Sequence, residues 1–177
     1  GKTFVESADL AQRPMVHVLG SGDIIWFSER DGFGHLYLYD GATGRLKRPL
    51  TSGPWTVRNL LRVDEAAGVI FIAATPEPGP GTDPYYRAVY RVRLSDGAVT
   101  RLTPEDADHA VTAAQDSIFD RPASSLGFSP SGRYFLATHT RADLPPITVL
   151  RRNDGRLVAE VERSEEHTSE LQSPCNL

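Results

Sequence analysis

Apolar and polar positions alternate over short runs along most of this chain, and turn-forming residues separate the runs. Alternation with a period of two predicts β-strands, whereas helical periodicity is nearly absent. The best helical candidate, residues 107–119, is at most a short insertion. The runs fall into three units, with strands expected at 15–19, 23–28, 35–39 and 45–50, at 57–63, 69–74, 88–94 and 99–102, and at 125–128, 134–139, 147–151 and 157–161.

An Asp-Gly pair recurs at the corresponding place of each unit, at 40–41, 96–97 and 154–155. Asp-Gly between two strands favours a hairpin, because Gly accepts a positive φ without a Cβ clash. Three repeats of a hairpin-rich unit favour a propeller over a sandwich or a barrel. The sequence therefore predicts an all-β fold over residues 1–162, a partial β-propeller of about three four-stranded antiparallel blades.

Composition narrows the classes of partner. The formal net charge is −4, Lys and Arg are scattered, and no apolar run approaches the ~18 residues of a membrane helix. We therefore expect neither nucleic acid nor a membrane as a partner. The chain opens within the strand pattern and without Met, so we expect a piece of a longer protein, whose compartment stays open between cytoplasm and periplasm.

The last fifteen residues, 163–177, break the pattern. They read RSEEHTSELQSPCNL, with no strand alternation and no apolar face. Residues 163–173 are similar to a translated sequencing-library adapter, which implies a non-native tail; the alternative is a natural, disordered polar tail. Cys175 is the only cysteine, so residues 1–162 offer no disulfide and no Cys ligand or nucleophile.

Several motifs resemble the propeller of the dipeptidyl peptidase IV branch of the prolyl oligopeptidase family, over roughly residues 20–162. The resemblance implies a propeller that caps a separate α/β-hydrolase domain with catalytic Ser, Asp and His, in a serine peptidase that acts on peptides. The alternative is a non-enzymatic propeller that binds a protein partner. The motifs are FSERDGFGHLYLYD at 27–40, GPWTV at 53–57, VYRV at 89–92, RLTP at 101–104 and FSPSGRYF at 128–135.

The family's functional residues do not transfer to this chain. The family holds the substrate's amino terminus with two adjacent glutamates, and Glu165-Glu166 lies in the adapter-like tail. A family arginine would fall near residues 11–13, where the alignment is too loose to assign Arg13. The resemblance therefore implies no catalytic, cofactor-binding or metal-binding residue here, and no cofactor.

Ser129 is the most tempting nucleophile. Residues 127–131 read Gly-Phe-Ser-Pro-Ser and nearly fit the Gly-x-Ser-x-Gly elbow. Pro130 has no N–H to donate to an oxyanion, so we interpret 129–132 as a hairpin turn. The histidines at 17, 35, 109 and 139 lack close ligand spacing, and the one at 109 follows an acidic run that we interpret as a solvated loop.

Aromatic residues and two long loops complete the candidates. We expect Trp26, Tyr37, Tyr39 and Trp55 to pack between blades. The loops at 75–86 and 112–121 are the better functional candidates, although plain variable loops are the stronger expectation. An open propeller also exposes the outer faces of its first and last blades, and we expect these faces to carry Ile25, Phe27, Phe135 and Val149.

Overall fold

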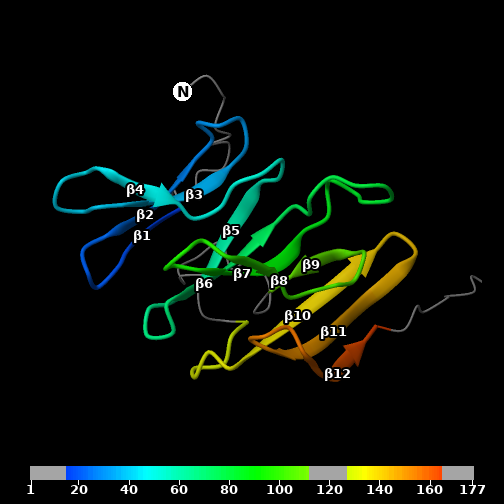
Figure 1. The fold of residues 1–177 in the computed structure, drawn as a ribbon. Coiled ribbons are helices and arrows are strands. Elements are labelled where there is room, and N and C mark those ends of the chain that lie inside the picture. The colour runs from blue at the N-terminus through cyan, green and yellow to red at the C-terminus, as the bar shows by residue number, and fades with distance from the viewer. Residues whose placement is uncertain (1–14, 112–126, 165–177) are drawn as a thin grey trace, which may run out of the picture.

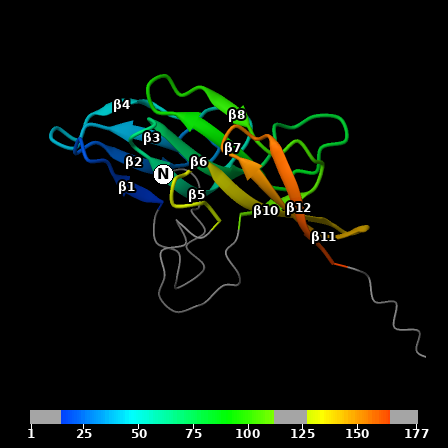
Figure 2. The same cartoon turned by 90° about the horizontal axis from the view of Figure 1, so that it is seen from below.

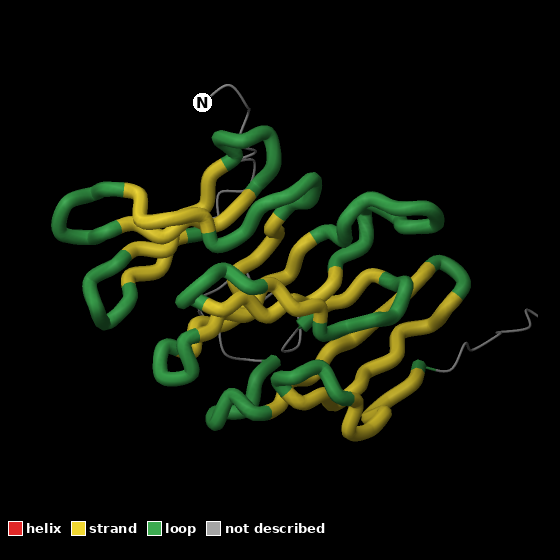
Figure 3. The backbone as a smooth tube through the Cα atoms, viewed as in Figure 1, coloured by secondary structure: helices red, strands yellow, loops and turns green. Residues whose placement is uncertain are grey.

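The computed structural model describes residues 15–111 and 127–164. In these residues every regular element is a strand (Figure 3), and the strands form three four-stranded antiparallel sheets. The predicted all-β class and partial propeller are confirmed. Blade 1 holds β1 (Val16–Val18), β2 (Ile24–Ser28), β3 (His35–Tyr39) and β4 (Leu46–Pro49), blade 2 holds β5 (Val57–Asp64), β6 (Val69–Ala74), β7 (Ala88–Arg93) and β8 (Val99–Arg101), and blade 3 holds β9 (Asp108–Ala110), β10 (Tyr134–Arg141), β11 (Leu144–Arg152) and β12 (Leu157–Arg163).

Blade 2 lies between blades 1 and 3 (Figures 1 and 2). Its strand β6 is apolar on both sides, and successive side chains of a strand point to opposite faces. Ile70 and Ile72 therefore enter a core shared with blade 1, while Phe71 enters a core shared with blade 3. The near-continuous apolar run of β6 reflects this burial on both faces.

A Leu-Thr pair follows the outer strand of blade 1 and that of blade 2, and its threonine makes the same hydrogen bond in both blades. The Leu36 amide donates to Thr51 Oγ1 at 3.0 Å, and the Val89 amide donates to Thr103 Oγ1 at 2.9 Å. Both threonines are buried, so these bonds satisfy polar groups that would otherwise be unpaired. The hydrogen bond recurs because in both blades the third strand packs against the segment that leaves the outer strand.

The hairpin glycine of blade 1 was wrongly assigned. Gly97 and Gly155 have φ of 75° and 91°, but in blade 1 the left-handed residue is Gly44, at φ 69°. The Gly44 amide donates to Asp40 O at 2.8 Å, as the Gly97 amide donates to the Arg93 carbonyl at the same distance. The left-handed glycine of blade 1 therefore lies three residues after Gly41. The turns of blades 1 and 2 have the same length, since the Asp40 amide donates to Arg45 O as the Arg93 amide donates to Ala98 O.

Blade 3 has an inner strand made of two separate pieces. Asp108–Ala110 pairs with β10 at residues 138–140, and Phe128 forms a single bridge to Phe135. A strand at 125–128 was expected, and residues 125–126 lie outside the described residues. The helical prediction at 107–119 is wrong for 108–110, because pairing with the open edge of β10 overrides local propensity.

The predicted residues of the outer faces are wrong. Ile25, Phe135 and Val149 are buried in the cores between blades, and Phe27 packs against one of them. The outer face of blade 1 instead carries Trp26, which is 41% exposed and pairs with Val16. Alternation defines two faces of a strand but does not say which one meets the neighbouring blade. Exposed apolar residues include Val16, Val18 and Trp26 in blade 1, and Leu136, Leu157, Val158 and Val161 in blade 3.

The last strand, β12, runs two residues beyond the expected strand at 157–161. Strand β12 includes Arg163, which pairs with Ile147 and holds Glu160 through a 2.8 Å ion pair. The Ser164 amide donates to Pro146 O at 3.0 Å. The rest of the adapter-like tail, residues 165–177, lies outside the described residues. In the described part of the chain no helix could cross a membrane.

Candidate functional site

A hollow of about 310 Å³ lies beside the long loop between β6 and β7. The loop at residues 75–86, a functional candidate from the sequence, forms one side of it. The linker from β8 to β9 forms another side. Its lining is more polar than apolar, with three prolines and two alanines beside polar and charged side chains. The lining residues are Pro76, Pro80, Gly81, Thr82, Tyr86, Arg87, Ala88, Arg101, Pro104, Asp106 and Ala107.

Arg87 is neutralised by Asp108. Its Nε and Nη2 donate to the two carboxylate oxygens of Asp108 at 2.9 and 2.6 Å, and its amide donates to the same carboxylate at 2.8 Å. Burial acts to raise the pKa of Asp108, but the hydrogen bonds from Arg87 outweigh it and lower that pKa. The pair is therefore ionised and joins the β6–β7 loop to β9.

Arg101 is held differently. Its Nε donates to Thr103 O at 2.7 Å and its Nη2 donates to Glu105 O at 3.1 Å. Both acceptors are neutral main-chain carbonyls, which orient the guanidinium group without cancelling its charge. Within the described residues Arg101 forms no ion pair at 4.0 Å or less. The hollow therefore has one fixed, uncompensated cation in its wall.

The rim of the hollow carries opposing charges. Asp106 lies 4.0 Å from the Arg141 guanidinium, and Arg141 itself is paired with Asp143 at 2.6 Å. Partial burial and the negative charge of Asp83 raise the pKa of Tyr86, so its hydroxyl stays a donor at neutral pH. The hollow thus combines a cationic wall with a weakly acidic rim.

A second polar cluster is buried between blades 2 and 3. His109 and His139 pair across β9 and β10 with ring centroids 5.5 Å apart, and Glu105 forms an ion pair with Arg151. The prediction that His109 sits in a solvated loop is wrong, because its side chain is 1% exposed. Burial lowers the pKa of His109. Among the described residues, four buried atoms of this cluster have no hydrogen-bond partner: Glu105 Oε2, His109 Nδ1, His139 Nδ1 and Arg151 Nε.

The other two described histidines, His17 and His35, contact neighbouring protein groups. His35 is buried, with Nδ1 3.0 Å from Thr51 Oγ1 and Nε2 3.0 Å from Gly53 O. His17 lies 3.7 Å from Glu65 across the blade 1–blade 2 boundary. In residues 15–111 and 127–164 no three His, Cys, Asp or Glu side chains are arranged to hold a metal ion.

Ser129 sits in the turn that precedes β10. Its amide donates to Tyr134 O at 2.9 Å, and its Oγ accepts the Tyr134 amide at 3.1 Å. The same Oγ lies 3.1 Å from Ser131 Oγ. The turn closes where Gly132 donates to Ser129 O at 2.8 Å. This arrangement gives the hydroxyl a structural role in a hairpin.

The aromatic residues divide between the two faces of blade 1. Trp55 is buried and stacks on Tyr90 at 5.8 Å, so its predicted packing is confirmed. The same prediction is wrong for Trp26, which lies on the outer face. Tyr37 is buried under the Arg30 guanidinium, 4.3 Å from its ring centroid. Burial and its bond to Asp31 raise the pKa of Tyr37 to about 12.

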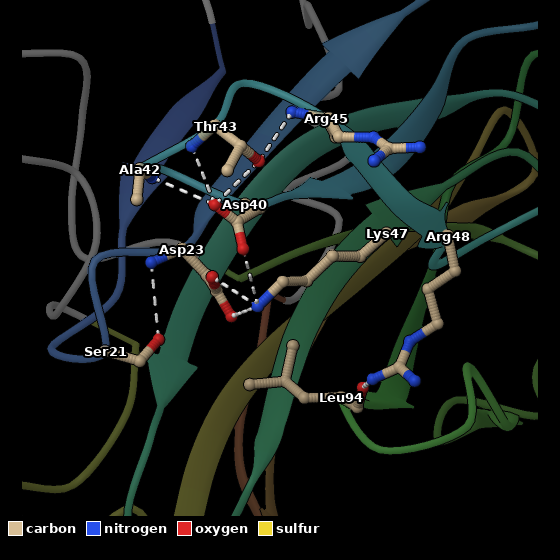
Figure 4. Close-up of polar contacts among 9 residues, drawn as sticks. All are labelled: Ser21, Asp23, Asp40, Ala42, Thr43, Arg45, Lys47, Arg48 and Leu94. Carbon is tan, nitrogen blue, oxygen red and sulfur yellow. Dashed lines mark hydrogen bonds and ion pairs between the residues drawn. The ribbon is translucent and has the colours of Figure 1, made fainter.

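Charged side chains also gather at one end of blade 1 (Figure 4). Lys47 Nζ lies 2.7 Å from Asp23 and 3.7 Å from Asp40, and Asp40 also accepts the amide of Thr43. The next residue, Arg48, donates to Leu94 O of blade 2. Lys47 pairs with Asp23 and Asp40, and Arg48 is held by a main-chain carbonyl, so the group closes the β3–β4 hairpin and joins it to blade 2.

Sequence reasoning found the loop of the site but missed its charges. Arg87 and Asp108 are far apart in sequence, and no spacing rule links them. Arg101 had been noted only as part of a family motif. The second candidate loop, at residues 112–121, lies outside the described residues, as do Arg13 and the Glu165-Glu166 pair.

Comparisons with family models, curated proteins and solved structures agree on one family. A family model described as dipeptidyl peptidase IV (DPP IV) N-terminal region matches residues 2–146. The "Probable dipeptidyl peptidase 4" of Aspergillus flavus is 29% identical over 118 residues, which are 67% of this chain and 13% of that protein. The crystal structure of Porphyromonas gingivalis dipeptidyl peptidase 4 is similar with a TM-score of 0.63 and 28% identity, covering 84% of this chain and 18% of that one.

A more distant likeness concerns the fold alone. The crystal structure of TolB from Acinetobacter baumannii has a TM-score of 0.52 and 20% identity, and the match covers 87% of this chain and 33% of that one. The chain therefore spans only a small part of each of these relatives.

Proposed function

Because this chain belongs to the dipeptidyl peptidase IV N-terminal region family, we propose that it is the propeller part of a dipeptidyl-peptidase-IV-like serine exopeptidase. In this proposal an α/β-hydrolase domain elsewhere in the parent protein supplies the Ser, His and Asp of an acyl-transfer mechanism. The single observation that carries the proposal is the family match over residues 2–146, which spans blades 1 and 2 and, in blade 3, β9, β10 and the start of β11.

The proposed role of the propeller is to cap the catalytic cavity and admit only short peptides. Continuous apolar cores join blade 1 to blade 2 and blade 2 to blade 3, so the blades form a stiff wall. A stiff wall restricts entry to openings of fixed size. A long or folded polypeptide would then have to unfold locally before it reached the nucleophile.

The chain by itself is expected to lack peptidase activity. Ser129 is engaged in its own hairpin and is followed by Pro130, which has no amide hydrogen for an oxyanion. Incubation with Xaa-Pro and Xaa-Ala chromogenic dipeptides tests this expectation. Turnover that co-purifies with the chain and disappears in Ser129→Ala would overturn it.

The parent protein provides the decisive experiment. Clean genomic sequence downstream of Glu162 should encode a hydrolase segment with Gly-x-Ser-x-Gly in strand–turn–helix context. The full-length protein should then release dipeptides from Xaa-Pro substrates, and replacement of that serine by Ala should abolish release. A stop codon, or further blades without a hydrolase segment, would favour the alternative of a protein-binding scaffold, which has only the fold likeness to TolB behind it.

The gating role has a separate test in the active parent. Phe71→Ala should loosen the contact between blades 2 and 3 without touching a catalytic group. We expect the rate on a long peptide to rise relative to that on a dipeptide substrate. An unchanged ratio in a folded variant would contradict gating and leave the peptidase assignment intact.

A further inference from the structure

The hollow beside the β6–β7 loop has the features of a binding site for a small anion-bearing ligand. Arg101 is oriented by two main-chain carbonyls, at 2.7 and 3.1 Å from its Nε and Nη2. A guanidinium group already fixed in this way loses little side-chain entropy when a ligand binds. Because its partners are neutral, its charge remains to be matched by a ligand.

The walls of the hollow set the size of that ligand. Pro76, Pro80 and Pro104 have fixed φ angles, and Ala88 and Ala107 are buried, so this part of the wall is stiff, while polar side chains make up the rest of the lining. A volume of about 310 Å³ is at the small end of ligand pockets. It suits one or two amino-acid residues and excludes a folded partner.

The surrounding charges set the charge of the ligand. Arg87 is already neutralised by Asp108 and offers little net attraction. Asp106 lines the same hollow, and its carboxylate repels a second negative charge on a ligand. One uncompensated cation facing one anionic rim residue favours a monoanion over phosphate.

We propose that this hollow binds the C-terminal carboxylate of a short peptide, with Arg101 as its charged anchor. The carboxylate follows from the hollow itself, whereas the choice of a peptide rests on the proposed function. The Arg101 guanidinium would receive the carboxylate, the Tyr86 hydroxyl would add a donor at the rim, and the last side chain would lie against the prolines. Such a site would hold peptides or dipeptide products on the propeller, at a place that performs no chemistry.

The test measures binding of acetyl-Ala-Pro to the 177-residue chain by isothermal titration, beside its C-terminal amide. N-acetylation keeps the probe from being a substrate. We expect the amide to bind about tenfold more weakly, because it loses the charge-assisted bond. Arg101→Gln should weaken binding of the acid by a similar factor, while the matched control Arg91→Gln, on β7 outside the hollow, should leave it unchanged.

A second variant keeps the test independent of any folding defect at Arg101. Thr82→Trp adds a large side chain from a half-buried loop position into the hollow, with Arg101 intact, and should abolish binding. Equal binding of acid and amide, or full binding by either variant, would overturn the proposal. Phosphate competing as well as the acetylated dipeptide would also overturn it. None of these outcomes depends on hydrolysis, so the proposed peptidase function stands or falls separately.

Discussion

The two interfaces between blades differ in the kinds of side chain that they bury. In the described residues, the interface of blades 1 and 2 buries thirteen residues in one apolar cluster with a stacked Trp55–Tyr90 pair. The interface of blades 2 and 3 buries eight, and beside them lie the Glu105–Arg151 ion pair and the facing histidines. The first is an apolar core, whereas the second combines a smaller core with a buried polar cluster.

The difference matters because the two kinds of interface respond to different perturbations. Apolar packing contains no titratable group, so pH has little direct effect on it, and it is weakened mainly by cavities. A buried polar cluster gives little net stability, but it is strongly destabilised when one partner is lost or its charge changes. We therefore expect a change of pH or of charge to weaken the interface of blades 2 and 3 more than the interface of blades 1 and 2.

Substitutions that create a cavity at one interface or the other should have the largest effect on stability. Phe71→Ala and Ile72→Ala alter neighbouring residues of β6 that are both 0% exposed and face opposite interfaces. Each should cost about 2–5 kcal/mol. Hydrogen exchange should rise in β10 and β11 for the first variant and in β2 and β3 for the second. A uniform rise in both variants would show that the blades unfold as one unit.

Removal of one ion-pair partner should have the next largest effect. Glu105→Ala leaves the buried Arg151 without its carboxylate, and because Glu105 is partly exposed we expect a loss of about 2–3 kcal/mol. The double variant Glu105→Leu/Arg151→Met should recover most of it in chemical denaturation. If the double variant is as unstable as Glu105→Ala, the ion pair itself, and not the stranded charge, is what holds the interface.

The hairpin glycines test how closely the blades approach. A Cβ at Gly155 would lie 2.9 Å from Leu102 O of blade 2, and one at Gly97 would lie 3.2 Å from Leu50 O of blade 1. Gly155→Ala should therefore cost more than Gly97→Ala. The control is Gly44→Ala, which has the same positive φ but open space, so it should cost only the backbone strain of about 1 kcal/mol. Equal melting temperatures for the three variants would contradict close packing of the turns.

Acidification should produce the smallest and most selective effect. Burial lowers the pKa of His109 below its ordinary value of 6.5, with Arg101 and His139 acting in the same direction and Glu105 opposing. The folded state then binds fewer protons than the unfolded state, so stability is complete above pH 6.5 and declines as the pH falls below it. His109→Gln should flatten this decline in thermal melts between pH 7 and 5, and an unchanged slope would exclude His109 as its source.

The fold could be predicted because its signals are local. The short apolar, β-prone runs of β2, β3, β6 and β7 and the turn glycines at 97 and 155 are readable from a few neighbouring residues. The errors share one cause, which is that long-range pairing decides the outcome. Asp108–Ala110 has no strand signal of its own and is a strand only because the edge of β10 accepts it. The face of Trp26 likewise depends on which side blade 2 occupies.

The candidate site was predictable only as a loop. Prolines between residues 75 and 84 marked an irregular segment, which the structure places on one side of the hollow. The charges that give the hollow its chemistry come from Arg101 and from the Arg87–Asp108 pair, which three-dimensional folding brings to the same wall. The His109–His139 pair was missed for the same reason, since thirty residues separate its members.

The turns of blades 2 and 3 also affect the order in which the blades can pack during synthesis. The turn at Gly97 packs on Leu50 of the preceding blade, and the turn at Gly155 packs on Leu102. A ribosome makes each of these leucines well before the glycine that covers it, and at about 5–20 residues per second the delay is on the order of several seconds. The outer strand of each blade therefore emerges uncovered and waits for the next blade. During that wait the nascent chain offers a bare strand end to chaperones, and translation speed through the following blade sets how long the exposure lasts.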